Sequence, residues 1–525
     1  MRDFHLPGRS AVFATNGMAA TSHPLGALIA VETLKAGGNA MDAAIAGAFV
    51  LQMCEPQMTG IGGDCFVLFQ RPGDAAPRAM NGSGRAPAAL KAEDLRAAGH
   101  DRMPAGGPLP VTLPGAVDAF CRLSEDWGRL GIDRLLAPAI HYAEAGVPVS
   151  PRTAFDWTAG EAFLTGAARE FYLLNGAAPS PGMLYRHPAL GEAFQHIART
   201  GRAGFYEGPV AEDMVAALRA AGGCHTEADF AAVAAEYTDP LKVAYGGATL
   251  HEHPPNGQGA TAILLLKILS KFDLAAMDPF GAERAHIEAE AVKLAYSARN
   301  RFIADPDHAT RTDHMTAPET AERLAALIRP DRAMQDPHRL SEEVHRDTIY
   351  ITVVDRDRMA VSLIYSIFRK FGAGLASDRF GILFHNRGSG FTLAEGHPNE
   401  AMGGKRPLHT IIPGMLSGSD FTMPFGVMGG AYQAAGHGRF VTNLMDYGLH
   451  PQAAIDAPRC FAYEGRLAVE RGYPDAVRAA LADLGHDVFI PDEPIGGAQA
   501  IRIDTGTGVL QGGSDPRKDG CALGY

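Results

Sequence analysis

Residues 347–366 of the chain read DTIYITVVDRDRMAVSLIYS. Two runs in this stretch, 348–355 and 359–366, are rich in β-branched and apolar residues, and a short charged turn separates them. This pattern predicts a β-hairpin whose first strand begins at Thr348. The preceding residues, 331–346, are polar, include a proline and show no sustained period, so they are predicted to form an exposed loop.

A threonine that heads a strand behind an exposed loop has the form of an N-terminal nucleophile. Such enzymes need a Ser, Thr or Cys made N-terminal by cleavage, a strand that holds it, and backbone donors for the oxyanion. The freed α-amine has a reference pKa of about 7.7–8.0, so near neutral pH it can accept the hydroxyl proton. Threonine is also common at strand starts, and a purely structural role for Thr348 is the alternative.

Helices and buried strands are both expected elsewhere in the chain. Apolar periodicity predicts helices at residues 24–36, 41–53 and 285–299, and Gly37-Gly38 offers the left-handed conformation that ends the first one. The segment TGIGGDCFVLF, residues 59–69, is predicted to be a glycine turn that leads into a buried strand.

The composition is that of a soluble globular protein, with 46% hydrophobic and 20% charged residues and a formal net charge of −12. Nucleic acid and anionic membranes are poor partners, because binding to them usually requires a basic face. The six cysteines are scattered, without the close pairs of a zinc site. The N-terminal residues show no apolar run of the length of a secretory signal, and no stretch approaches the ~18 apolar residues of a membrane span. We therefore expect a cytoplasmic protein.

Several blocks of the sequence, in a fixed order, resemble the γ-glutamyltransferase (glutathione hydrolase) family along nearly the whole chain. They are GMAATSHPLGALIAVETLKAGGNAMDAAIA at 17–46, EPQMTGIGGDCFVLF at 55–69, NGSGRAP at 81–87, LPGAV at 113–117, LAPAIHYAEAGVPVSP at 136–151, FYEGPVA at 205–211, PPNGQG at 254–259, DTIYITVVDRD at 347–357, FGAGLAS at 371–377, KRPLHTIIPGM at 405–415 and FGVMGG at 425–430. A match of this extent is highly specific.

The resemblance implies an α+β fold, the four-layer αββα sandwich of N-terminal-nucleophile hydrolases. It implies cleavage between Asp347 and Thr348 into a large subunit, 1–347, and a small subunit, 348–525, which together form one intertwined domain. A homo-oligomer of the cleaved heterodimer is a further possibility. No metal or organic cofactor is implied.

The same resemblance assigns roles to individual residues. Thr348 is similar to the processing-site threonine and nucleophile, and Ser366 stands where the family has a hydroxyl that hydrogen-bonds it. Gly429 and Gly430 match the pair whose backbone N–H groups form the oxyanion hole. Arg85 resembles the arginine that grips the glutamyl α-carboxylate. Thr352, four residues along the same strand, is a candidate second support for the nucleophile, with simple strand packing equally expected.

The donor pocket departs from the family pattern. Gly390 stands where the aspartate that binds the substrate ammonium would be, and Arg387 replaces a neutral amide. His409 and Thr410 replace a pair of serines and are expected to contact the substrate. Phe368, Arg369 and Lys370 occupy a second segment where polar residues are usual, and its cations could add positive charge to the pocket.

A site that loses an anion and gains cations should favour an acyl group with a carboxylate but no nearby amine, such as glutaryl, oxamyl or a cephalosporin side chain. Gly390→Asp should then restore the preference for γ-glutamyl donors. The principal functional hypothesis is a self-processing hydrolase or acyltransferase of γ-glutamyl amides such as glutathione. The acylase for amine-free dicarboxylate monoamides is the alternative.

The sequence gives less support to nucleotide binding, metal binding or a purely binding role. Residues 60–65, GIGGDC, lack the third glycine of a dinucleotide fingerprint. His251-Glu252-His253 places two imidazoles on one face of a strand, but no third metal ligand is evident and a solvent-exposed edge is the expected explanation. An unprocessed homologue that acts only as a binding protein has no physical need for Thr348, the glycine pair and Arg85 together.

Overall fold

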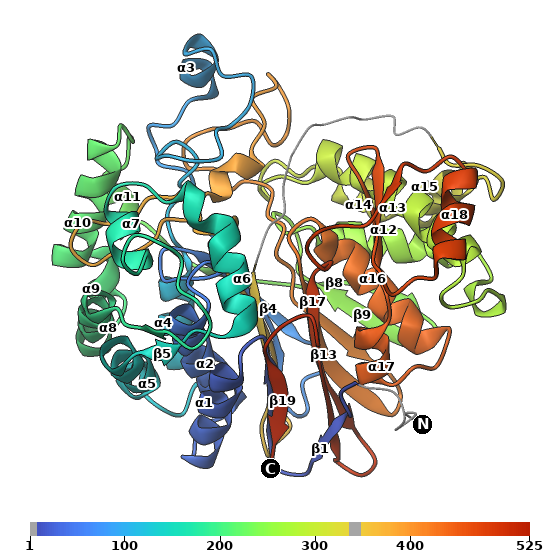
Figure 1. Ribbon diagram of the computed structural model, residues 1–525, viewed down its shortest axis with the longest axis horizontal. Helices are drawn as coiled ribbons and strands as arrows, with labels where there is room; N and C mark the ends of the chain where they lie inside the picture. Colours follow the sequence, from blue (N-terminus) through green and yellow to red (C-terminus); the bar gives the residue numbers. More distant parts are fainter. Residues whose placement is uncertain (1–7, 335–347) are drawn as a thin grey trace.

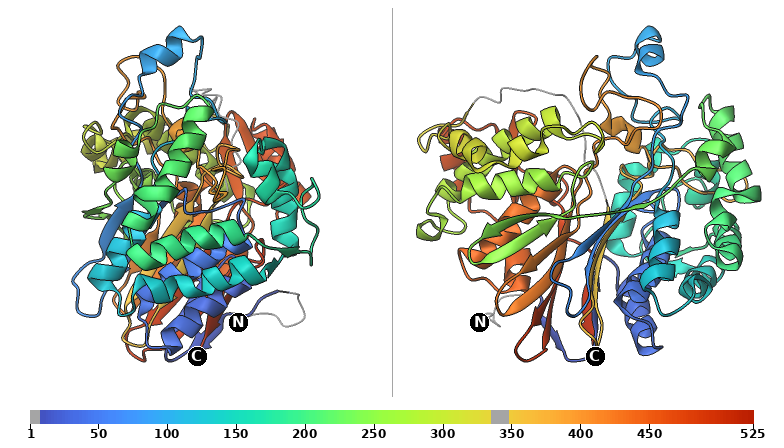
Figure 2. Two further views of the ribbon diagram at one scale, coloured as in Figure 1. Left: turned by 90° about the vertical axis from the view of Figure 1, so that its left-hand side faces the viewer. Right: turned by 180° about the vertical axis from the view of Figure 1, so that it is seen from behind.

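Two seven-stranded antiparallel sheets pack face to face in the computed structural model, which describes residues 8–334 and 348–525 (Figure 1). Helices cover the outer face of each sheet, so the layers run helix, sheet, sheet, helix (Figures 1 and 2). This arrangement confirms the predicted αββα sandwich. Asp347 and residues 335–346 of the predicted loop lie outside the described residues.

The strands of each sheet come from distant parts of the chain. The first sheet has the order β1 (Val12–Ala14), β18 (Leu510–Ser514), β17 (Gly497–Asp504), β13 (Phe421–Met428), β12 (Gly414–Ser417), β9 (Ala248–Glu252), β8 (Leu241–Tyr245). The second has the order β19 (Cys521–Gly524), β2 (Met18–Thr21), β10 (Ile349–Val354), β11 (Ala360–Ser366), β3 (Asp64–Gln70), β4 (Arg78–Gly82), β7 (Glu236–Thr238). Each sheet therefore mixes strands from before residue 335 with strands from after residue 347.

β10 and β11 are the predicted hairpin, and both faces of it are buried. Alternation along β10 directs Ile349 and Ile351 into the apolar core under the helices, whereas Tyr350 and Val354 point between the two sheets. A strand buried on both faces needs a nearly continuous apolar run, which is the pattern that the sequence shows.

The turn of the hairpin is fixed by Asp355. Its carboxylate accepts the N–H of Met359 at 3.0 Å and, at 3.0 Å, the N–H of Ala40 at the start of α2 (Ala40–Cys54). Asn39 and Asp42 form a capping box at the same helix end. The far end of the hairpin is thereby attached to the helix that packs across it.

Three apolar layers hold the sandwich together: one under each set of helices and one between the sheets. The helices that pack on the second sheet include α1 (Pro24–Lys35), α2, α4 (Ala116–Trp127), α5 (Ile132–Ala145) and α8 (Pro188–Thr200). Those on the first sheet include α12 (Gly259–Leu269), α13 (Ala282–Phe302), α15 (Pro318–Ala325), α16 (Tyr432–Met445), α17 (Pro451–Asp456) and α18 (Asp475–Asp483).

Shorter elements decorate this core. They are α3 (Ala92–Ala97), α6 (Pro151–Gly160), α7 (Ala167–Tyr172), α9 (Ala203–Tyr206), α10 (Gly208–Ala220), α11 (Glu227–Ala231), α14 (Thr312–Thr316), the 3-10 turns at Glu161–Phe163, Leu274–Ala276 and Arg387–Gly390, and the strands β5 (Val147–Pro148), β6 (Leu184–Tyr185), β14 (Cys460–Tyr463), β15 (Arg466–Val469) and β16 (Val488–Phe489). The three predicted helices correspond to α1, α2 and α13. Of the helices in the described ranges, none has the length and apolarity needed to span a membrane.

Candidate active site

Thr348, Ser366 and Asp64 lie in one row across three neighbouring strands. β11 and β3 pair Ser366 with Asp64, and Thr348, one residue before β10, places its hydroxyl 3.3 Å from that of Ser366. Residues opposite each other in antiparallel strands share a face of the sheet. The next residues along this face belong to the apolar cluster between the sheets, so this nucleophile row points into the space between them.

Ser366 is hydrogen-bonded to the nucleophile and to the backbone that follows β11. Its Oγ accepts the Thr348 hydroxyl at 3.3 Å and the backbone N–H of Phe368 at 2.8 Å. Phe368 has a φ of 81°, a conformation that costs a bulky residue free energy and tends to occur at functional sites. The predicted contact between Ser366 and the nucleophile is therefore present, while the role of Ser366 in processing stays a prediction.

Asp64 is the centre of a fully buried cluster of polar side chains, the Asp64 cluster, formed with His385, Arg387 and His409. One carboxylate oxygen, Oδ2, lies 3.1 Å from His409 Nε2, 3.3 Å from His385 Nδ1 and 3.7 Å from Arg387 Nε. The other, Oδ1, accepts the backbone N–H groups of Gly84 at 3.1 Å and Gly115 at 3.3 Å. Both oxygens are thus engaged within the protein.

The charge states in this cluster follow from its contacts. Burial alone would raise the pKa of Asp64, but the charges and hydrogen bonds of His385 and His409 outweigh it and hold that pKa well below the usual range. Burial, with the nearby Arg387, lowers the pKa of His409 to about 3. At neutral pH Asp64 is therefore an anion and His409 is a neutral donor to it.

Arg387 is the buried cation of the site. Its Nη1 donates to Thr410 Oγ1 at 3.2 Å, and its guanidinium carbon lies 4.0 Å from the centre of the Phe368 ring. Arg387, His409 and Thr410, all predicted to contact substrate, therefore lie together beside the nucleophile row.

Gly429 and Gly430 form the turn between β13 and α16. Both have positive φ, 121° and 56°, and a Cβ on Gly429 would lie 2.9 Å from the Cα of Gly496. Their carbonyl oxygens accept the N–H groups of Tyr432 at 3.0 Å and Gln433 at 3.2 Å. Glycine is therefore required at this turn, as the oxyanion-hole assignment expects.

Arg85 is placed differently from Arg387. Its guanidinium contacts Asp305 at 3.2 Å, Glu236 at 3.3 Å and the carbonyl oxygen of Gly404 at 3.0 Å, and about a third of the side chain is exposed. It therefore pairs with two carboxylates and also attaches its segment to Gly404. Its predicted grip on a substrate carboxylate stays a prediction.

Lys370 does not add positive charge to the pocket. Its Nζ lies 2.5 Å from Glu493 and 3.7 Å from Asp156, so two carboxylates neutralise it. Of the predicted extra cations, Lys370 is therefore removed, and Arg387 is the one that lies in the Asp64 cluster. For Arg369 the backbone N–H donates to Asn386 Oδ1 at 3.1 Å, which attaches this segment to the Asp64 cluster side of the site.

At Gly390 a close contact with a neighbouring carbonyl, and not the backbone φ, opposes any residue with a side chain. A Cβ at this position would lie 2.4 Å from the carbonyl oxygen of Leu408, and the backbone there is not left-handed. The prediction that Gly390→Asp restores an ammonium site stays a prediction, and this contact shows that the added side chain would have to displace the segment that carries His409 and Thr410.

Two further predictions were tested by the contacts. The Thr352 hydroxyl donates to the carbonyl of Val361 at 3.0 Å, which is strand packing and not support for the nucleophile. The explanation of His251 and His253 as an exposed edge was wrong: β9 is an interior strand and both imidazoles are buried. His253 stacks on Phe66 with 4.0 Å between ring centres.

Within the described ranges, His286, Glu290 and His486 are the one group of three side chains close enough to share a metal ion. Their ligand atoms are already in use. His286 and His486 bond each other at 2.8 Å, and Lys293 donates to Glu290 at 2.7 Å. An ammonium that already occupies the cation position argues against a metal there.

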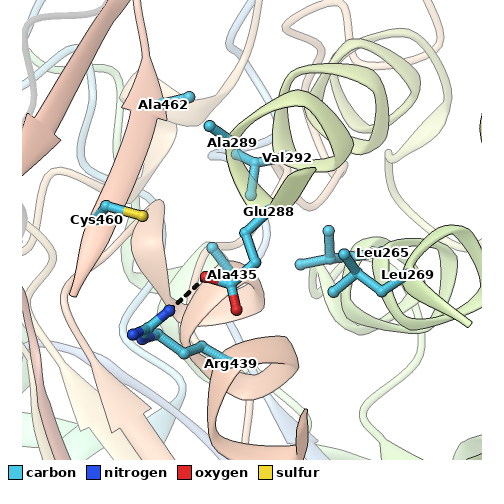
Figure 3. A pocket seen from close by; sticks show the side chains of 9 residues that line it. All are labelled: Leu265, Leu269, Glu288, Ala289, Val292, Ala435, Arg439, Cys460 and Ala462. Carbon is cyan, nitrogen blue, oxygen red and sulfur yellow. Dashed lines mark hydrogen bonds and ion pairs between the residues drawn. The ribbon is translucent and has the colours of Figure 1, made fainter. Parts of the chain in front are cut away.

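A cavity lies away from the nucleophile row, among α12, α13, α16 and β14 (Figure 3). Its volume is about 10 Å³, and its lining includes Glu288, Arg439 and Cys460. A space of this size holds at most about one water molecule. It is therefore a packing defect beside a buried ion pair and too small for a substrate.

The comparison with known families agrees with this geometry. A family model described as gamma-glutamyltranspeptidase matches residues 26–525. The chain belongs to the gamma-glutamyltranspeptidase family. It is therefore an N-terminal-nucleophile hydrolase, as the resemblance implied.

Relatives within the family carry different names. The chain is 34% identical to the glutathione hydrolase-like YwrD proenzyme of Bacillus subtilis, with 98% of this chain and 99% of that protein covered. It is also 34% identical to the oxamate amidohydrolase proenzyme of Klebsiella pneumoniae, at the same coverage. The solved cephalosporin acylase of Bacillus halodurans superposes with a TM-score of 0.92 and 36% identity over 100% of this chain and 99% of the other.

The sequence did not reveal Asp64 as a site residue. A signal was present: Asp64 directly precedes the apolar run 65–69, and a carboxylate in a buried strand needs partners. Those partners lie more than 300 residues away in sequence, at His385, Arg387 and His409, so only the folded chain identifies them.

Proposed function

We propose that the chain cleaves itself between Asp347 and Thr348 and that the freed Thr348 hydrolyses monoamides of short dicarboxylates that carry no α-ammonium. One observation decides which acyl donor we propose. The acid in the nucleophile row, Asp64, already accepts hydrogen bonds from Gly84, Gly115 and His409 and lies within 4 Å of His385 and Arg387, and a close contact with Leu408 opposes an acid at Gly390.

Electrostatics support the same donor class. A substrate carboxylate would face the buried guanidinium of Arg387, and a bidentate or charge-assisted bond to arginine is among the stronger polar contacts in proteins. A substrate ammonium would face that same cation with no uncommitted anion in the Asp64 cluster, which disfavours its binding. The oxamate amidohydrolase and cephalosporin acylase among the relatives are consistent with amine-free acyl groups.

The chemistry divides into two balanced steps. The Thr348 Oγ attacks the amide carbonyl carbon, the α-amine of Thr348 accepts the hydroxyl proton, and the Gly429 and Gly430 N–H groups stabilise the oxyanion. The α-amine then gives that proton to the leaving amine, the C–N bond breaks and an ester on Thr348 forms. Water attacks the ester in the same way and releases the carboxylic acid.

The second candidate is hydrolysis of γ-glutamyl amides such as glutathione, and the family itself favours it. The deciding measurement is kcat/KM for the p-nitroanilides of glutaric acid and of γ-linked glutamate, which differ only in the α-amine. We expect the glutaryl compound to be preferred by at least about tenfold. A preference for the γ-glutamyl compound would establish the second candidate instead.

Maturation has its own test. Gel electrophoresis of the purified protein should show two bands, and Edman sequencing of the smaller one should begin Thr-Ile-Tyr-Ile. A single uncleaved band from an inactive protein would support the binding-protein alternative.

A further inference from the structure

Gln258, the residue directly before α12, is a fully buried side chain that contacts both halves of the site. Its Nε2 donates to the carbonyl oxygen of Thr410 at 2.6 Å and to that of Gly430 at 3.0 Å. Its Oε1 accepts Nη1 of Arg299 at 3.1 Å. One amide group thus connects the segment behind Arg387 with the oxyanion turn.

The direction of this amide is fixed by chemistry. A guanidinium has only donors, so the atom that faces Arg299 must be the oxygen of Gln258. The NH₂ group is then obliged to face the two carbonyls. Arg299 itself is buried, and its guanidinium carbon lies 4.5 Å from the ring centre of Tyr296, one turn earlier in α13.

The Gly430 carbonyl matters because it belongs to the turn that carries the oxyanion donors. The preceding carbonyl, Gly429 O, is directed at the N–H of Tyr432 in α16. In a planar trans peptide the C=O and N–H point in opposite directions, so the N–H of Gly430 points away from that helix. Gln258 and the N–H of Gln433 both donate to the next carbonyl, that of Gly430, so the turn is held from α16 and from the residue before α12.

The Thr410 carbonyl matters because the side chain of the same residue holds Arg387 at 3.2 Å. We propose that Gln258 is a positioning residue that fixes the distance between the oxyanion turn and the Arg387–Thr410 pair, and thereby sets the length of acyl chain that the site accepts. This inference rests on the proposed function, in which the turn receives the oxyanion and Arg387 the distal carboxylate.

Support for Gln258 comes entirely from the part of the chain before the cleavage point. Besides the Arg299 contact, the Tyr296 hydroxyl donates to the carbonyl of Ala431, directly after the glycine pair. α13 therefore holds the oxyanion turn both directly and through Gln258. Residues of the large subunit therefore position Gly429 and Gly430, the oxyanion residues, which lie with Thr348 in the small subunit.

The test measures kcat and KM on oxalyl, succinyl and glutaryl p-nitroanilides, which differ in the number of carbons between the anilide and the free carboxylate. Gln258→Met keeps the shape and removes the donors, so kcat on the best donor should fall about 100-fold, as for loss of an oxyanion contact, while KM changes little. The ratio of kcat/KM between the best and the next chain length should shrink at the same time. Arg299→Lys, which lets the amide rotate, should shrink that ratio in the same direction.

Gln452 offers a matched control. It is also a buried glutamine, and its Nε2 donates to the carbonyl of Ser514 at 2.9 Å in β18, in a region without site residues. Gln452→Met should lower the unfolding midpoint comparably and leave kcat and the chain-length ratio unchanged. If Gln258→Met lowers kcat no more than Gln452→Met, or leaves the ratio unchanged, the positioning role is overturned.

The two proposals fail separately. A wild-type preference for γ-glutamyl over glutaryl amides would overturn the proposed donor. The effect of Gln258→Met on kcat would still be measured on that preferred γ-glutamyl donor, and its absence there would overturn the positioning role.

Discussion

Two groups of buried charges in this protein look alike and do different things. The Asp64 cluster holds one carboxylate among Arg387, His385 and His409. The Glu288 cluster, on the far side of the first sheet, holds one carboxylate between Arg284 at 2.8 Å and Arg439. Figure 3 shows the contact between Glu288 and Arg439. In both, burial would raise the pKa of the acid, and the neighbouring donors outweigh burial and lower it.

The difference lies in what each cluster faces. The Asp64 cluster continues a row of side chains that contains Thr348 and Ser366, whereas the Glu288 cluster lines a cavity of about 10 Å³ with Cys460 and apolar side chains. A buried ion pair and a shifted pKa are therefore insufficient to identify a site. Alignment with a nucleophile on one face of a strand is the informative feature.

Loss of the nucleophile should have the largest effect. Thr348→Ala removes the hydroxyl needed for both self-cleavage and acyl transfer, so the chain should stay as one band and kcat/KM should fall by at least about 10⁴-fold. Gel electrophoresis and the glutaryl anilide assay measure these outcomes. A cleaved or active Thr348→Ala protein would mean that the nucleophile is another residue.

Asp64→Asn should come next. The variant keeps the shape but leaves Arg387 buried without its anion, and removing one partner of such a pair costs about 2–5 kcal/mol, or roughly 30-fold to several thousand-fold in kcat/KM. The assay is run on mature enzyme at several pH values. Unchanged kinetics would show that the Asp64 cluster, like the Glu288 cluster, contributes to stability and not to catalysis.

The two arginines should separate clearly. Arg387→Lys loses the planar fork beside Thr410 and Phe368, and we expect KM for the glutaryl donor to rise about 30-fold. Arg85→Lys, whose guanidinium already pairs with Asp305 and Glu236, should change KM by less than about threefold. The opposite ranking would show that Arg85 grips the carboxylate, as the resemblance implies.

The pH dependence should show one rising limb. Asp64 stays ionised and His409, with a pKa of about 3, stays neutral above pH 5. The proton acceptor is then the freed α-amine of Thr348, whose reference pKa is about 7.7–8.0, so kcat/KM should fall about tenfold from pH 7 to pH 6. A profile flat down to pH 5 would exclude the α-amine as the base.

The smallest kinetic effect is expected at the Glu288 cluster. Glu288→Gln leaves Arg284 and Arg439 without their anion, so the free energy of unfolding should fall by about 3–5 kcal/mol. Because the cluster faces no site residue, kcat/KM should stay within about twofold of wild type. Urea unfolding measures the free energy change, and the anilide assay measures kcat/KM. A large fall in kcat/KM would show that the Glu288 cluster also contributes to catalysis.

Local patterns in the sequence were enough for the individual elements. The run 348–366 predicted the hairpin because a strand buried on both faces must be apolar throughout. The three predicted helices are present as α1, α2 and α13, although α2 is buried at every residue and therefore has no single apolar face. The resemblance also named Thr348, Ser366, Gly429, Gly430 and Arg85 as site residues, and the departures from the family pattern named Arg387, His409 and Thr410.

Only the tertiary structure decided which charges are available to a substrate. Asp64 follows a glycine turn in the sequence, and it comes close to Arg387 only in the folded chain. The charge of Lys370 is neutralised by Glu493. A side chain at Gly390 would contact the carbonyl oxygen of Leu408. Electrostatic contacts and steric exclusion act across space over a few ångströms, and the partners here come from segments hundreds of residues apart. The chain therefore determined by itself what kind of enzyme it is, and the packing of its layers decided which charged side chains lie beside Thr348.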